Sequence, residues 1–214
     1  MKGKQAMIKN IVFDIGNVLI HFDWDGFLRR NGADEEDVAV VGKQAIHSPL
    51  WRTLDENIVP FDTVRTQLME AVGEKRAHWI QMMLEWYEGM CITAPYSLPW
   101  LNALRARGYK LYVLSNFSEH GFQRAAKRLP FLNYLDGYLI SYEVKLMKPS
   151  PDIYMALCQK YNLNPEECLM IDDLKENVEG ARSCGFSGLV FESTKTPEIF
   201  QHKLDLILKE NGLG

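Results

Sequence analysis

The sequence predicts an α/β protein with a doubly wound, mostly parallel sheet and an inserted, all-helical second domain. Short apolar runs rich in β-branched and aromatic residues alternate with helical patterns, which is typical of strands buried on both faces of a parallel sheet. Such alternation favours right-handed crossovers between neighbouring strands. The alternation is interrupted once, because residues 21–92 show helical patterns and no strand pattern.

Five segments carry the strand pattern, and turn or cap residues follow each of them. They are residues 8–14, 110–115, 137–141, 168–172 and 188–192. Helical patterns follow the strands at 96–107, 119–128, 151–161, 174–184 and 196–209. Three glycines, at positions 108, 185 and 212, stand where helices are expected to stop.

The interruption has helical patterns at roughly 24–42, 61–72 and 75–90. In the last of these, Trp79, Met83, Trp86 and Met90 fall on one helical stripe. A helix-bundle core explains this stripe, and a cofactor or partner surface is the alternative. We therefore predict a core domain of residues 1–20 and 93–214, with residues 21–92 inserted as a smaller helical domain.

Charge and cysteine content limit the classes of function. The formal net charge of the 214 residues is −4 and the basic residues are scattered, so no footprint for nucleic acid or anionic membrane is visible. The four cysteines form no CxxC pair, which favours a reducing compartment and argues against zinc. The first apolar run ends too early, at Asp14, for a signal peptide, and no run is long enough to span a bilayer. We expect a cytoplasmic protein whose partner is a small molecule; the oligomeric state is not readable from the sequence.

Polar side chains gather at the predicted carboxyl ends of the strands, where ligands bind in open α/β sheets. The first strand ends in Asp14 and the second in Ser115 and Asn116, and Lys148 lies after the third. The fourth strand ends in Asp172 and Asp173, and Asn177 follows one helical turn later.

Each of these residues has an ordinary explanation when taken singly. Asp14 and Ser115 fit helix N-caps, and Lys148 fits a solvated surface lysine. The adjacent acids Asp172 and Asp173 are different, because they repel each other unless a cation or a lysine lies between them. Three carboxylates with one lysine form an oxygen-rich site suited to Mg²⁺, and the neighbouring donors suit an anion. This combination fits phosphoryl transfer with an aspartate nucleophile.

Four segments together carry a family resemblance. The order "FDIGNVLI", "VLSN", "KLMKPSPDIY" and "MIDDLKENVEGARSCG" resembles the haloacid dehalogenase (HAD) superfamily of phosphatases over essentially the whole chain. The resemblance implies a Rossmann-like core, with the helical insert as a C1-type cap that closes over the site and selects the substrate. The "FDIGNVL" form and the overall length look closest to a branch that contains an α-D-glucose-1-phosphate phosphatase.

The resemblance also implies roles for the residues. Asp14 is expected to be the nucleophile and a Mg²⁺ ligand, and Gly16 to offer its backbone carbonyl to the metal. Asp173, together with Asp172, would complete the metal site, and Asn177 would hold these acids in place. The remaining three residues would act on the phosphoryl group: Ser115 and Asn116 would bind its oxygens, and Lys148 would neutralise its charge and that of the nucleophile.

Position 16 departs from the usual pattern of the superfamily, in which a second aspartate acts there as the acid–base. Such a group is worth about 10²–10⁴ in rate, and glycine has no side chain to supply it. One hypothesis is a substrate whose leaving group needs little protonation, such as an anomeric sugar phosphate or an acyl phosphate. The other is that His21, Asp23 or a cap residue replaces the missing acid. The cap residues considered for the cleft are Trp24, His47, Trp51 and Arg52.

The sequence thus predicts a Mg²⁺-dependent phosphatase that hydrolyses a small phosphorylated metabolite, with sugar phosphates first, through an aspartyl-phosphate at Asp14. The alternative is a weakly active or non-catalytic phosphometabolite-binding protein, because of Gly16. Retention of Asp14, Ser115, Lys148 and Asp173 favours the enzyme. A haloacid-type dehalogenase, which needs no metal, is a third possibility that the acidic pair at 172–173 disfavours.

Overall fold

The computed structural model describes residues 7–192 and Asp205, and its centre is a parallel sheet. Within these residues the sheet has five strands in the order β5-β4-β1-β6-β7, and every neighbouring pair is parallel. The strands are β1 (Asn10–Phe13), β4 (Lys110–Ser115), β5 (Gly137–Ile140), β6 (Cys168–Asp172) and β7 (Ser187–Val190). This topology confirms the predicted fold class and places β1 between β4 and β6.

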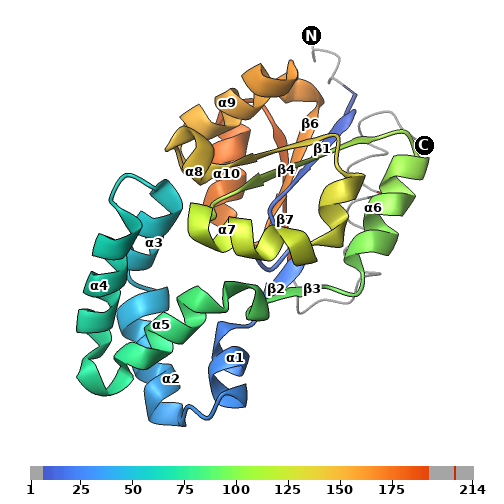
Figure 1. Ribbon diagram of the computed structural model, residues 1–214. Helices are drawn as coiled ribbons and strands as arrows, with labels where there is room; N and C mark the ends of the chain where they lie inside the picture. The colour runs from blue at the N-terminus through green and yellow to red at the C-terminus, as the bar shows by residue number, and fades with distance from the viewer. Residues whose placement is uncertain (1–6, 193–204, 206–214) are drawn as a thin grey trace.

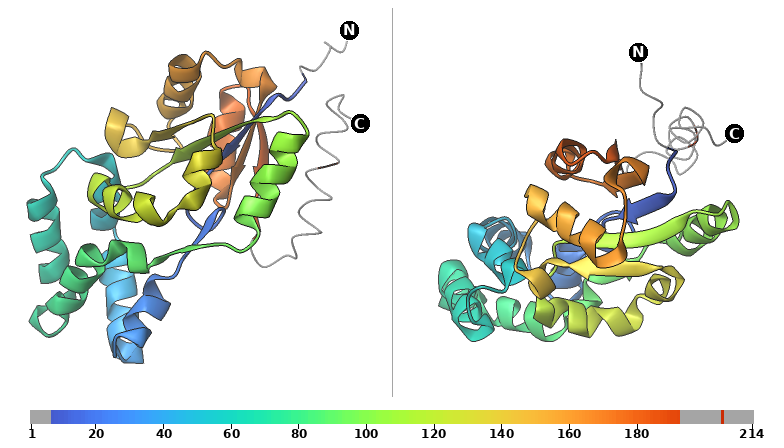
Figure 2. Two further views of the ribbon diagram at one scale, coloured as in Figure 1. Left: turned by 45° about the vertical axis from the view of Figure 1, so that its right-hand side comes forward. Right: turned by 90° about the horizontal axis from the view of Figure 1, so that it is seen from above.

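Helices cover both faces of the sheet, and α7 and α10 lie on opposite sides of it (Figure 2, right). Ile11 and Phe13 of β1 pack in one apolar cluster with residues of α6 and α7, whereas Val12 packs in a second cluster with residues of α9 and α10. This alternation is the period of two expected for a strand with two buried faces. The helices and 3₁₀ turns are α6 (Ser97–Ala106), α7 (Glu119–Ala125), η4 (Ala126–Arg128), η5 (Pro130–Tyr134), α8 (Ser141–Val144), α9 (Pro151–Tyr161), η6 (Pro165–Glu167) and α10 (Lys175–Ser183).

The predicted helix stops are confirmed at two glycines. Gly108 and Gly185 have φ angles of +88° and +93°, a conformation that glycine adopts without steric cost. Apart from Asp205, the predicted helix at 196–209 and the stop at Gly212 lie outside the described residues.

The insert is helical, but its helices differ from the predicted ones. They are α1 (Trp24–Arg30), α2 (Glu35–Val41), the π-helical turn η1 (Gly42–Ile46), α3 (Pro49–Glu56), α4 (Phe61–Val72), η2 (Glu74–Arg76), α5 (Ala77–Glu85) and η3 (Tyr87–Gly89). The helical pattern predicted at 24–42 is divided into two helices, because Gly32 turns the chain with φ +99° and Asp34 caps α2 by accepting from the N–H of Asp37. The predicted helix at 75–90 likewise divides into α5 and two 3₁₀ turns.

The stripe in the last part of the insert is mostly core. Trp79, Met83 and Met90 are buried, as the helix-bundle interpretation predicts. Trp86 is 56% exposed, so for this residue the prediction is wrong. Trp86 is the C-cap of α5, and the chain departs from helical geometry at this residue, with φ −115° and ψ 41°.

A short antiparallel ribbon joins the insert to the sheet. It pairs β2 (Ile20–Phe22) with β3 (Cys91–Thr93), which corrects the expectation that residues 21–92 contain no strand. The predicted boundaries at 20/21 and 92/93 fall inside this ribbon, and the division into two domains stays a prediction. Figure 1 shows α1–α5 gathered to one side of the sheet.

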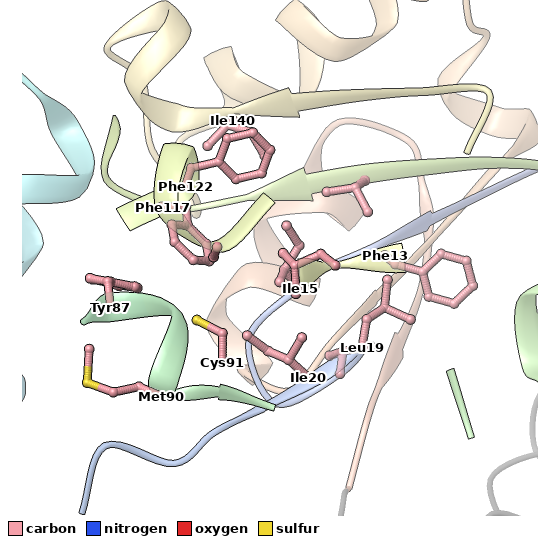
Figure 3. Packing of buried hydrophobic residues seen from close by; sticks show 14 of the residues in the cluster. Phe13, Ile15, Leu19, Ile20, Tyr87, Met90, Cys91, Phe117, Phe122 and Ile140 are labelled. Carbon is pink, nitrogen blue, oxygen red and sulfur yellow. The ribbon is translucent and has the colours of Figure 1, made fainter. Parts of the chain in front are cut away.

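The apolar core runs through this junction without a break. Leu19 and Ile20 belong to one buried cluster with Met90 of the insert and with Phe117 and Phe122 of the core (Figure 3).

Among residues 7–192, no helix has the length and apolar character that crossing a membrane would require.

Candidate active site

The predicted site residues meet at the carboxyl edge of the sheet. Because β4, β1 and β6 are neighbours, their ends bring Ser115, Asp14 and Asp172 side by side. The N–H of Asp14 donates to the carbonyl of Ile171 at 2.9 Å, which fixes the end of β1 against β6. The topology therefore explains why residues separated by more than a hundred positions share one site.

Lys148 is the electrostatic centre of the site. Its side chain is fully buried, and its Nζ lies 2.9 Å from Oδ1 of Asp14 and 2.6 Å from Oδ2 of Asp172. Burial works against its charge, but the two carboxylates outweigh this effect and hold the pKa of the ammonium above its usual value. Lys148 is therefore charged and forms ion pairs with both acids, and it is not a solvated surface lysine.

Asp14 is buried, and neighbouring side chains bind one of its two carboxylate oxygens. Burial raises the pKa of its carboxyl to about 6, although Lys148 lowers it, and the charge of Asp172 raises it further. Ser115 donates from Oγ to Oδ1 of Asp14 at 2.7 Å. The serine hydroxyl and the ammonium thus bind the same oxygen and fix the orientation of the carboxylate.

Three carboxylates are placed to hold a cation. Asp14, Asp172 and Asp173 each offer one oxygen atom, and these atoms lie within 4.8 Å of one another. Oxygen donors of this kind suit a hard divalent ion such as Mg²⁺ or Ca²⁺. Burial, and then the charge of Asp172, raise the pKa of Asp173, as expected for acids that are crowded without a cation between them. The residues therefore fit the predicted magnesium site.

The two adjacent acids at the end of β6, Asp172 and Asp173, differ in their partners. Oδ1 of Asp172 accepts from the N–H of Leu174 and from Nδ2 of Asn177, both at 2.9 Å, while Oδ2 accepts from Lys148. Oδ2 of Asp173 accepts from Nδ2 of Asn17 at 3.3 Å, a long hydrogen bond. Asp173 is therefore better placed to bind a ligand, whereas Asp172 positions Lys148.

Asn116 contacts the main chain of Lys148 through both ends of its amide. Its Nδ2 donates to the carbonyl of Lys148 at 3.0 Å, and its Oδ1 accepts from the N–H of Lys148 at 2.9 Å. The amide thus fastens the loop that carries the lysine. Asn116 also lines the cavity described below, so its predicted contact with the phosphoryl group stays a prediction.

Gly16 is not required by the turn after β1. Its φ lies outside the left-handed region, and a Cβ at this position would meet only Oδ2 of Asp14, at 3.8 Å. The left-handed residue of the turn is Asn17, with φ +52°, whose Oδ1 accepts from the N–H of Phe22. The turn would therefore accept a side chain at position 16.

A cavity of about 490 Å³ lies over these residues, between the sheet edge and the helical insert. Its floor includes Asp14, Lys148 and Asp173, and part of its wall is aromatic. The four cap residues named from the sequence all line it: Trp24, His47, Trp51 and Arg52. The other aromatic residues of the wall are Phe22, Tyr87 and Phe117.

Sequence reasoning missed two acids that line this cavity: Asp55 of α3, which is half-buried, and Glu176 of α10, which is exposed. Burial, and then the charge of Asp14, raise the pKa of Asp55 to about 7. No helix was predicted at 49–56, so Asp55 was not considered. The available signal was Ser48–Pro49, an N-cap residue followed by proline at the first helical position.

The two acid–base candidates named from the sequence lie elsewhere. Asp23 accepts from Nη1 of Arg30 at 2.6 Å, and His21 is exposed on β2 with its ring edge toward Tyr96. Neither is among the residues that line the cavity. The structure therefore does not bring His21 or Asp23 to Asp14.

Two proteins of known function are similar to this chain in sequence. The chain is 26% identical over 196 residues to D-ribitol-5-phosphate phosphatase of Bacteroides thetaiotaomicron, which covers 84% of this chain and 90% of that protein. It is 31% identical over 87 residues to (S)-2-haloacid dehalogenase 4A of Burkholderia cepacia, covering 41% and 38%.

A solved structure shares the fold. It is a HAD family enzyme from Bacteroides thetaiotaomicron in complex with magnesium and inorganic phosphate, with a TM-score of 0.70, 22% identity, and coverage of 90% of this chain and 98% of that one. A model of the family described as haloacid dehalogenase-like hydrolase matches residues 8–185. The chain therefore belongs to the haloacid dehalogenase-like hydrolase family.

Proposed function

We propose that this protein is a Mg²⁺-dependent phosphatase that hydrolyses a small phosphorylated metabolite through an aspartyl-phosphate at Asp14. One observation carries the proposal: at the floor of the cavity, the Asp14 carboxylate is bound by Lys148 and Ser115 and lies beside two further acids. A fixed carboxylate next to positive charge is what attack on a phosphoryl group requires. The similarity to a named phosphatase over most of the chain supports the same reaction.

The residues divide the work as follows. Asp14 attacks phosphorus, while Ser115 holds its carboxylate in one orientation. Lys148 keeps positive charge at the point where the attacking carboxylate and the phosphoryl oxygens approach each other. Mg²⁺ held by Asp14, Asp173 and the main-chain carbonyl of Gly16, with Asp172 in support, would neutralise the phosphoryl charge.

The cavity suits a substrate of sugar-phosphate size. Its volume of about 490 Å³ lies within the common range for small-molecule sites. Trp24 and Trp51 offer flat apolar surfaces, and His47 and Arg52 offer polar groups for hydroxyls. The name of the similar D-ribitol-5-phosphate phosphatase supports polyol and sugar phosphates as the first compounds to test.

A screen of phosphorylated metabolites tests the function. Inorganic phosphate release is measured for sugar, polyol and acyl phosphates, with Mg²⁺ and with a chelator in its place. We expect Mg²⁺-dependent release by the wild type, and loss of at least about 10³ in Asp14→Asn because the nucleophile is removed. Asp152→Asn, which changes an exposed acid in the first turn of α9, is the matched control.

The same screen separates the two alternatives. Binding of inorganic phosphate without turnover of any compound would support the phosphometabolite-binding protein. Halide release from 2-haloacids would support dehalogenation, for which the partial similarity to a haloacid dehalogenase is the motivating observation. Activity that survives Asp14→Asn would contradict the mechanism.

A further inference from the structure

Asp55 is an acid inside the cavity that has no part in the chemistry described so far. It comes from α3 of the insert and faces the same cavity as Asp14, Lys148 and Asp173. The reaction lacks one component, because Gly16 leaves no group to protonate the departing oxygen or to activate water. A carboxyl group that lines the same cavity as the nucleophile could supply this component.

The position of Asp55 is fixed by the core and not only by the cap. Its main-chain carbonyl accepts from Oγ of Ser141 at 2.7 Å. Two residues later, Nδ2 of Asn57 donates to Oε2 of Glu119 at 3.0 Å. These two contacts tie the end of α3 to the segments that follow β5 and β4, so Asp55 keeps a defined place over the site.

Its electrostatic surroundings differ from those of the other acids. Asp14 and Asp172 share Lys148, whereas among the described residues Asp55 forms no ion pair. Burial, and then the charge of Asp14, raise its pKa to about 7; the Ser118 N–H and Arg52 act in the opposite direction, and Glu56 adds to the rise. Asp55 is therefore able to hold a proton and to lose it near neutral pH, as an acid–base must.

The other titratable groups of the cavity fit this role less well. Burial holds the pKa of Tyr87 well above its usual value, so its hydroxyl keeps its proton near neutral pH. His47 and Glu176 are exposed, and the ring of His47 packs edge-on against Trp24. Asp55 is half-buried, and the charge of Asp14 raises the pKa of its carboxyl.

We propose that Asp55 is the general acid–base of this enzyme and replaces the side chain that position 16 lacks. The inference rests on the proposed phosphatase function. As an Asp14 oxygen bonds to phosphorus, the bond from phosphorus to the leaving oxygen breaks, and the Asp55 proton passes to that oxygen to release an alcohol. The Asp55 carboxylate then takes a proton from water, whose oxygen attacks the phosphorus of the aspartyl-phosphate. Inorganic phosphate leaves, and the Asp14 carboxylate and protonated Asp55 are restored.

Leaving-group dependence tests the acid role. In Asp55→Asn, turnover of an alkyl phosphate should fall by about 10²–10⁴, because the alkoxide leaves unprotonated. With p-nitrophenyl phosphate, whose leaving group needs no proton, the variant should release one equivalent of nitrophenolate in a burst. Slow turnover should follow, because water attack then lacks its base. Asp62→Asn, which changes an exposed acid in the first turn of α4 that does not line the cavity, should behave as wild type.

The pH profile gives a second readout. In the wild type, kcat for the alkyl phosphate should fall as pH rises through about 7, because Asp55 must be protonated to donate, and this limb should be absent in Asp55→Asn. A rise in KM with unchanged kcat would assign Asp55 to substrate binding and overturn the proposal. An equal loss for all leaving groups, without a burst, would also overturn it, because it indicates a structural effect.

A rescue variant separates chemistry from folding. Position 16 accepts a Cβ, so Asp55→Asn combined with Gly16→Asp places a carboxyl beside Asp14 again and should restore the alkyl phosphate rate at least tenfold. Failure of this rescue would count against the proposal only if Gly16→Asp alone is active. If the wild type releases phosphate from no compound, the phosphatase function itself fails and the inference fails with it.

Discussion

At the scale of single residues, Lys148 determines the charge balance of the site. It is buried between Asp14 and Asp172, so Lys148→Met would leave two buried acids without a cation. We expect the free energy of unfolding to fall by about 3–5 kcal/mol in the absence of divalent ions, and phosphate release to be lost. Urea unfolding and phosphate release measure the two effects. Lys127→Met, at an exposed position, is the control, and equal stability of both variants would contradict the assigned role.

The strand-end residues were predictable from the sequence, and Asp55 was not. Asp14, Ser115 and Asp172 each end an apolar run, and parallel strands must bring their carboxyl ends to one edge. The position of Asp55 in the cavity depends instead on how α3 packs over the core, and no local sequence pattern indicates that packing. The structure was also required to interpret Gly16, because only the backbone angles show that the turn does not require glycine there.

At the scale of elements, Asp37 joins two helices of the insert. Its carboxylate accepts from Nε of Arg76 at 2.8 Å and from Nε1 of Trp79 at 3.1 Å. Burial opposes its charge, but these donors outweigh it and lower its pKa below the usual 3.8. Asp37→Asn should cost about 1 kcal/mol at neutral pH, a value kept low because Arg76 reaches solvent.

The pH dependence of this cost follows from the sign of the shift. Because the pKa of Asp37 is lowered in the folded state, its contribution is fully present above the unfolded value of about 4 and is lost as pH falls through the folded value. The stability difference between wild type and Asp37→Asn should therefore shrink between pH 5 and pH 3, measured by urea unfolding. Asp62→Asn, with a side chain 80% exposed, should show little difference at any pH.

The elements that were predicted correctly are those that have a clear pattern of apolar residues within their own sequence. The five strands of the sheet are continuous apolar runs, and α4 (Phe61–Val72) was predicted with the observed bounds. The ribbon of β2 and β3 has three residues in each strand, too few for a periodic signal. The break between α1 and α2 was signalled by Gly32 and Asp34, a turn residue and a cap that the longer apolar pattern concealed.

At the scale of the whole molecule, one apolar cluster links the sheet to the insert, and the site lies where the two meet. The metal site draws on β1 and on the segment after β6, which are far apart in the sequence. A cation bound there therefore connects distant parts of the fold and is absent from the unfolded chain. Binding to the folded state alone stabilises a protein by RT ln(1 + [L]/Kd), about 2.7 kcal/mol at 100 times Kd.

Magnesium should consequently raise the melting temperature of the wild type. For a chain of this length each kcal/mol shifts Tm by about 2–4 °C, so saturating Mg²⁺ should add about 5–10 °C, and a chelator should reverse the shift. Asp173→Asn should abolish most of the effect, because its carboxylate is the better placed of the two acids at the end of β6. Asp152→Asn should retain it. The same Mg²⁺ shift in Asp173→Asn as in the wild type would contradict the assigned site, because the cation would then be stabilising the fold from a place that does not involve these three carboxylates.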